Sequence, residues 1–146
     1  MAWVAITETM LTEALSSLEL EAYRSSGLAT GQADPVANTI LRAVEEVRGY
    51  VAAGGNTLGA DGTVPERLLD AALSIIRYRV LTRLPLDVSQ DRRTARDDAY
   101  QLLRDVAARR FLIEQPVTAD TEESAKPLPK ISVRDTFLDR AKQEGI

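Results

Sequence analysis

Apolar side chains recur at three- and four-residue steps along three long segments of this chain, which is the spacing of one buried face on an α-helix. The first segment begins at Asp34-Pro35, a strong helix start because Asp caps free amides and Pro suits the first helical position. Gly54-Gly55 ends it. The predicted buried face consists of Val36, Ile40, Ala43, Val44, Val47 and Val51. The opposite, exposed side is predicted to carry Arg42, Glu45, Glu46 and Arg48.

The second segment carries two apolar stripes instead of one. Pro65 is predicted to be its first helical residue and Pro85 to stop it. One stripe contains Leu69, Ala72, Leu73, Ile76, Val80 and Leu84, and the other contains Leu68, Ala71, Ile75 and Tyr78. Two stripes imply burial on two sides, so we expect this helix at the centre of the fold.

The third segment runs from Ser89 or Asp91 to Phe111, and two shorter helical patterns lie near the start of the chain. One of these follows Thr7 and the other extends from about Ser17 to Ser25. Loops are expected at residues 26–32 and in the glycine-rich stretch 54–62. The sequence thus predicts an all-α fold, a small bundle of about four to five helices over residues 1–112.

Residues 113–146 are predicted to form an extended C-terminal tail. Its first half contains three prolines among polar residues and cannot bury enough surface to fold alone. Its second half regains an apolar side, made of Ile131, Val133, Phe137, Leu138 and Ala141. A sticky segment on a polar tether is typical of a docking tail that binds a partner or a neighbouring subunit. A tail that folds back on its own bundle fits the pattern equally well.

The residue inventory argues against catalysis. The chain has no His and no Cys, which excludes disulfides and removes the commonest zinc ligands and nucleophile–base pairs. The loop 54–62 lacks the Lys-Ser/Thr of a phosphate-binding loop, and adjacent carboxylates such as Glu45-Glu46 point about 100° apart on a helix. We therefore expect no enzymatic activity, no cofactor and no metal site. No apolar run approaches the ~20 residues that span a bilayer, so we expect synthesis in the cytoplasm and no membrane partner.

Charge is distributed unevenly along the chain. Residues 1–64 hold 3 basic and 8 acidic side chains, residues 65–112 hold 10 and 7, and residues 113–146 hold 5 and 7. A mixed, solvated surface is the ordinary interpretation. The sharper hypothesis is a head-to-tail interface between copies, in which an acidic front meets an arginine-rich middle. The residues predicted to form such intersubunit ion pairs are Arg77, Arg79, Arg83, Arg92, Arg93, Arg96, Glu45 and Glu46.

The same arginines leave a small helical DNA-binding regulatory protein as the alternative function. They flank the turn between the two predicted central helices, where a basic cluster could contact phosphates. The acidic net charge of −4, the lack of stacking aromatics and the aspartates interspersed with the arginines count against it. A hydrolase or transferase is a further, weaker alternative.

Several of these segments resemble one family. Ile6-Thr7, the run Ala43-Val44-Glu45-Glu46-Val47-Arg48-Gly49-Tyr50-Val51, Val64-Pro65-Glu66-Arg67-Leu68, and the segments 75–83 and 92–111 look like tailed-phage head–tail connector or neck adaptor (head-completion) proteins, particularly the Mu-like branch. The likeness covers roughly residues 5–112 as an ordered pattern of helices. The glycine-rich loop departs from the shorter connection of that branch.

The resemblance implies a structural protein of the bacteriophage virion neck, made in the host cytoplasm. It implies a homo-oligomeric ring, a dodecamer, that lies below the portal protein and extends the DNA channel without sequence-specific binding. The ring would provide a docking platform for a tail terminator or stopper protein. The C-terminal tail would clasp the portal or an adjacent copy.

Overall fold

The computed structural model describes residues 2–27, 34–84 and 87–116. Within these residues the chain forms five α-helices: α1 (Glu8–Ala14), α2 (Ser17–Gly27), α3 (Pro35–Ala53), α4 (Leu69–Thr82) and α5 (Gln90–Ala107). Two short strands, β1 (Trp3–Ala5) and β2 (Thr63–Pro65), form an antiparallel pair. The predicted all-α class is confirmed, with this small sheet as an addition that the sequence did not reveal.

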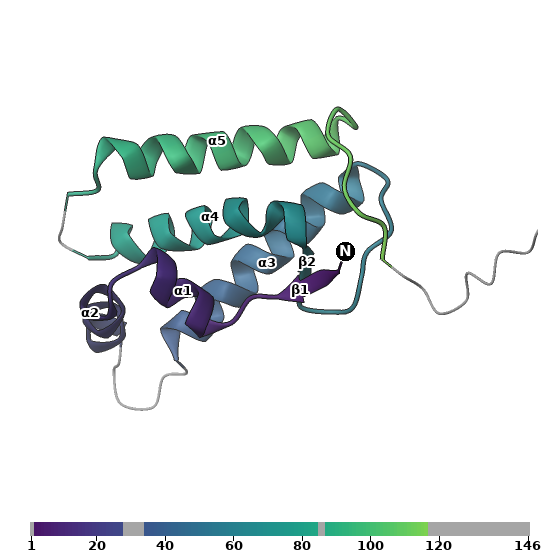
Figure 1. The fold of residues 1–146 in the computed structure, drawn as a ribbon. Coiled ribbons are helices and arrows are strands. Elements are labelled where there is room, and N and C mark those ends of the chain that lie inside the picture. Colours follow the sequence, from purple (N-terminus) through teal and green to yellow (C-terminus); the bar gives the residue numbers. More distant parts are fainter. Residues whose placement is uncertain (1, 28–33, 85–86, 117–146) are drawn as a thin grey trace, which may run out of the picture.

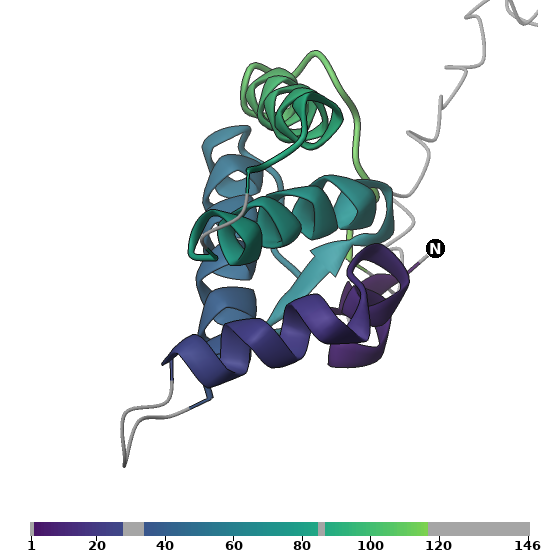
Figure 2. The same cartoon turned by 90° about the vertical axis from the view of Figure 1, so that its left-hand side faces the viewer.

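Helix α4 lies at the centre of the body, as its two apolar stripes predicted. It contacts α5 on one side and α1, α2 and α3 on the other (Figure 1). Figure 2 shows α3 crossing behind α4, and α2 running along the end of the molecule opposite the C-terminal turn of α5. Residues from both stripes are buried, among them Ala72, Ile76 and Val80 from one and Ala71 and Ile75 from the other. The chain's own helices therefore cover most of this apolar surface.

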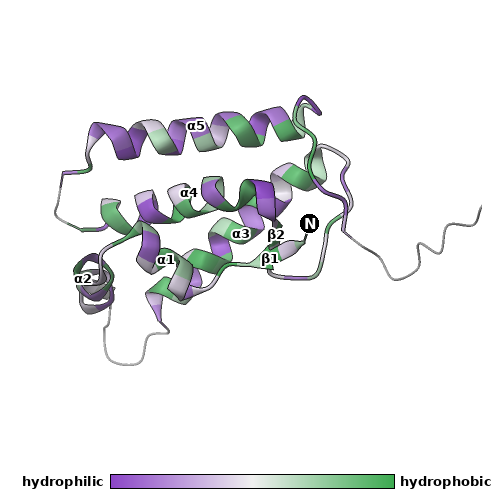
Figure 3. Cartoon of the chain, viewed as in Figure 1, coloured by the Kyte–Doolittle hydropathy of each residue, from purple (hydrophilic) through white to green (hydrophobic). Residues whose placement is uncertain are grey.

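The capping signals of α3 work as the sequence predicted. The Asp34 carboxylate accepts a hydrogen bond from the Val36 amide at 3.0 Å, and Pro35 occupies the first turn. Gly54 caps the other end, and Gly55 follows with φ +75°, a left-handed conformation that favours glycine. The buried face consists of the predicted valines together with Ala43, whereas Ile40 is only half-buried. Figure 3 shows α5 as the most hydrophilic of the long helices, consistent with an outer position on the body.

Several predicted boundaries are wrong. Pro65 ends strand β2 instead of opening a helix, because Val64 pairs with Val4 across the sheet. A 3₁₀ turn over Glu66–Leu68 follows, and α4 begins only at Leu69. Helix α2 continues to Gly27, and α5 ends at Ala107 instead of Phe111.

Arg48 is buried, which the helical periodicity did not predict. Its side chain is 6% exposed, and its guanidinium donates to the carbonyls of Gly59 at 3.2 Å, Ala60 at 2.8 Å and Thr63 at 2.9 Å. The cation also lies 5.8 Å from the centre of the Trp3 ring. One arginine of α3 therefore anchors both the glycine-rich loop and the start of β2.

The packed body continues past residue 112, where the sequence analysis placed the start of the tail. Ile113 is buried in the core. The Trp3 indole donates to the Glu114 carbonyl at 3.2 Å, and the Gln115 amide donates to the Asn56 side chain at 3.1 Å. The segment after α5 therefore returns alongside the N-terminal strand and the glycine-rich loop (Figure 1).

Candidate functional site

A three-residue polar network joins the long helices at mid-body. Glu46 of α3 forms an ion pair with Arg79 of α4. The Tyr100 hydroxyl of α5 donates to the Glu46 carboxylate at 3.1 Å and accepts from Arg79 at 3.4 Å. Burial raises the pKa of Tyr100, and the Glu46 charge raises it further. Burial lowers the pKa of Arg79, but its hydrogen bond to Tyr100 and the Glu46 charge outweigh this effect and raise the pKa overall. These groups fix helix positions from inside one chain.

A second set of charged contacts holds the N-terminal half of α5. Arg92 pairs with Glu19 of α2 at 3.0 Å. Burial raises the pKa of Glu19, but a hydrogen bond from the Ser16 amide and the charge of Arg92 outweigh it, so the pKa is lowered overall. Arg96 lies 4.2 Å from the Tyr78 ring centre and pairs with the neighbouring Asp97.

The predicted intersubunit ion-pair residues therefore divide into two groups. Arg79, Glu46, Arg92 and Arg96 have partners within their own chain. Within the described residues, no in-chain ion pair forms at Arg77, Arg83, Arg93 or Glu45. Among the described residues, members of this second group can pair with another molecule without breaking an in-chain ion pair.

Two of these arginines line surface hollows. Arg83 borders an open hollow of about 540 Å³ between α2, α3 and α4. Its lining residues are Tyr23, Thr39, Arg42, Glu46, Arg79, Thr82 and Arg83. Three arginines against one carboxylate make this hollow basic, so it suits an acidic side chain or another anion.

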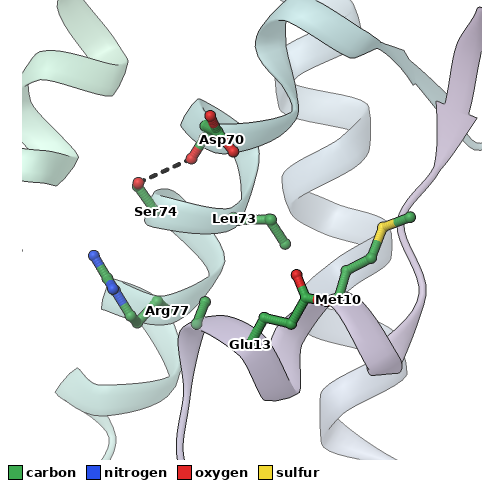
Figure 4. Close-up of a pocket in the computed structure, with 7 residues that line it drawn as sticks. Met10, Glu13, Asp70, Leu73, Ser74 and Arg77 are labelled. Carbon is green, nitrogen blue, oxygen red and sulfur yellow. Dashed lines mark hydrogen bonds between the residues drawn. The ribbon is translucent and has the colours of Figure 1, made fainter.

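Arg77 belongs to a smaller groove of about 300 Å³ between α1 and α4 (Figure 4). Leu73 points from α4 toward α1, whereas Arg77 extends away from α1. Glu13 and Asp70 are exposed at the rim. The groove is shallow, with a narrow apolar floor and charges of both signs around it.

Four large apolar side chains stay exposed on the described surface. Leu18 in α2 is 76% exposed and Leu112 after α5 is 78% exposed; Leu41 in α3 and Leu58 in the glycine-rich loop are the other two. Nothing in the sequence pattern singled out any of these four leucines as exposed. An exposed residue in a short amphipathic helix has no periodic signal of its own, so only the packing reveals it.

No convergent ligand set occurs in the part of the chain that the structure describes. Among its residues, no three carboxylate, His or Cys side chains gather where a metal ion could bind. None of the helices described is long and apolar enough to cross a bilayer. The predicted docking residues of the tail, Ile131, Val133, Phe137, Leu138 and Ala141, lie outside the described residues.

Comparison with known proteins identifies the family. Residues 6–129 match the model of the family described as "Bacteriophage Mu, Gp36". The match covers most of the chain, so the chain belongs to this family and is a phage protein of the Mu-like type. Neither the curated proteins nor the solved structures contain a match to it.

Proposed function

We propose that this member of the Bacteriophage Mu Gp36 family is a structural adaptor of the virion neck. In this role, copies of the chain form a ring below the portal, extend the DNA channel and provide the surface on which a tail or stopper protein docks. The observation that carries the proposal is the match to a phage protein family over residues 6–129, a range that includes all five α-helices.

The surface of the body supports an assembly role. The described residues form a buried hydrophobic core, yet leucines are exposed at Leu18, Leu41, Leu58 and Leu112. Arginines without an in-chain ion partner among the described residues lie beside two surface hollows. A surface that carries both exposed apolar side chains and charges without an in-chain ion partner suits a reversible interface between preformed subunits.

The C-terminal tail is the proposed attachment arm to the portal or to a neighbouring copy. About 30 residues follow the body, and an extended chain of that length reaches roughly 100 Å. Its apolar side at Ile131, Val133, Phe137, Leu138 and Ala141 supplies the binding energy in this proposal. The net charge of −4 suits a channel that lets DNA pass without gripping it.

Portal attachment tests the tail's role. The full-length chain and a variant lacking residues 127–146 are each incubated with portal particles of the same phage, and co-sedimentation is measured. We expect the deletion to abolish binding and to leave the helical circular dichroism signal unchanged. The paired variant Phe137→Asp/Leu138→Asp should reproduce the loss, whereas the control Asp139→Asn should bind normally. Undiminished binding by the deletion variant would refute the role of the tail.

DNA binding remains the alternative to test. A salt-sensitive shift of duplex DNA that disappears in Arg92→Ala/Arg93→Ala would favour a regulator. The in-chain pairing of Arg92 with Glu19 leaves less free positive charge at this corner than the sequence indicated. We therefore expect no such shift at physiological salt.

A further inference from the structure

Among the described residues, the two most exposed large apolar side chains belong to segments at opposite ends of the body. Leu18, 76% exposed, is in α2, and Leu112, 78% exposed, follows the C-terminal turn of α5. Figure 1 shows α2 at one end and the segment after α5 at the other. A single exposed leucine is ordinary, so the surroundings of each residue decide whether it belongs to an interface.

Leu18 is part of a continuous exposed face of α2. Glu21, Ala22 and Ser25 follow it at three- and four-residue steps, and all four are exposed. Glu21 forms no ion pair with any described residue. This face, called the α2 face below, combines an apolar knob, small side chains and one available negative charge.

Leu112 lies beside two arginines, each of which has a carboxylate partner in its own chain. Arg67 donates to the Leu112 carbonyl at 3.1 Å, while its Nε pairs with Glu114 at 2.8 Å. The Arg110 side chain is 72% exposed, and its nearest carboxylate, Asp105, is 3.6 Å away, so its charge is only loosely compensated. This corner, called the Leu112 corner below, combines an exposed leucine with an exposed arginine that is only weakly paired.

We infer that the α2 face of one copy docks on the Leu112 corner of the next, with Leu18 packed near Leu112 and Glu21 paired with Arg110. Each patch exposes a leucine, and Glu21 of one is opposite in charge to the exposed Arg110 of the other, so a second copy of the same chain supplies a matching partner for each. DNA phosphates would fit the Leu112 corner but not the α2 face. A contact between two different patches at opposite ends lets every copy bind two neighbours and can close into a ring.

This inference rests on the proposed ring and names its contact. It also differs from the ion pairs expected from the sequence, because Arg79, Arg92, Arg96 and Glu46 are used within one chain. The contact uses instead Glu21, which has no ion pair among the described residues, and Arg110, whose exposed side chain has only a 3.6 Å contact with Asp105.

Mixing of complementary variants tests the inference by sedimentation velocity on the full-length chain. Leu18→Asn removes the apolar contact of the α2 face, and Leu112→Asn removes that of the Leu112 corner. Because both side chains are exposed, the fold should not change. We expect each variant alone to associate about 10- to 100-fold more weakly than wild type. An equimolar mixture should form one-to-one dimers through the two intact ends and no larger species. The control Leu41→Asn, at an exposed leucine of α3, should associate like wild type.

A charge exchange gives an independent readout. Glu21→Arg and Arg110→Glu should each weaken association, and the double variant should recover it because the pair is restored with reversed polarity. Wild-type association in both Asn variants, a mixture that stays monomeric, or no recovery in the double variant would overturn the inference. If the Asn variants still form rings on the portal, the proposed function stands and the contact lies elsewhere. A wild-type chain that is monomeric at every concentration and forms no ring on the portal overturns both.

Discussion

Replacing Arg48 by Met tests whether one buried arginine holds the glycine-rich loop to the body. Met keeps the length and apolar character of the stem but lacks every donor, so the carbonyls of Gly59, Ala60 and Thr63 lose three hydrogen bonds of 2.8–3.2 Å. Bonds from a charged donor contribute about 1.5–3 kcal/mol each, while removing the buried cation recovers part of its desolvation cost. We expect a net loss of about 3 kcal/mol in the free energy of unfolding.

Thermal unfolding followed by circular dichroism measures this loss. For a body of this size, about 3 kcal/mol lowers Tm by roughly 10 °C. Arg42→Met is the matched control, because Arg42 is exposed on the same helix, and it should change the free energy by less than about 0.5 kcal/mol. Arg48→Lys should fall between the two, since an ammonium group cannot reproduce the planar fork. Equal Tm values for Arg48→Met and Arg42→Met would refute the anchoring role.

Two further predictions concern packing and pH. A Cβ at Gly59 would lie 2.5 Å from the Trp3 ring, so Gly59→Ala should destabilise the fold by about 1–3 kcal/mol. Gly49 lies in the interior of α3, and a Cβ there would meet no neighbouring atom within 4 Å. Gly49→Ala should therefore stabilise the fold by about 0.5–1 kcal/mol. Urea titrations giving the same sign for both would contradict this. Burial raises the pKa of Glu19, but the hydrogen bond from the Ser16 amide and Arg92 lower it overall, so these contacts stabilise the fold above the ordinary value of 4.5. This stability is lost as pH falls through the lower folded value. Glu19→Gln should therefore cost up to about 1 kcal/mol at neutral pH and nothing in strong acid; an equal cost at both would contradict the assignment.

The long helices could be predicted because their signals are local. Asp34-Pro35 and Gly54-Gly55 lie at the two ends of α3 and set those ends through contacts with residues close by in the sequence. The helical spacing of apolar residues identifies its buried face. The double stripe of α4 placed that helix at the centre, where the structure shows it.

The small sheet and the buried arginine could not be predicted in this way. Strand β1 pairs with β2 about 60 residues further along, and three-residue strands are too short for a periodic signal. The helical spacing of apolar residues alone places Arg48 on the polar side of its helix. It is buried because the glycine-rich loop and Trp3 fold over that side, which only the tertiary structure reveals.

The partners of the charged residues could not be predicted from the sequence either. Counts along the chain identified an acidic first part and an arginine-rich middle, but they cannot distinguish pairing within a chain from pairing between chains. Glu46 meets Arg79 because α3 crosses α4 at that level, and Glu19 meets Arg92 because α2 passes the start of α5. The packing uses these residues internally, whereas among the described residues Glu21 has no ion pair and the exposed Arg110 is only weakly paired with Asp105.

Electron microscopy of the full-length chain mixed with the portal of the same phage tests the proposed neck role most directly. A ring of additional density stacked coaxially on the tail-facing side of the portal, and absent with the chain lacking residues 127–146, is the predicted result. Portal particles that remain bare, with the chain left in solution as single subunits, would contradict it.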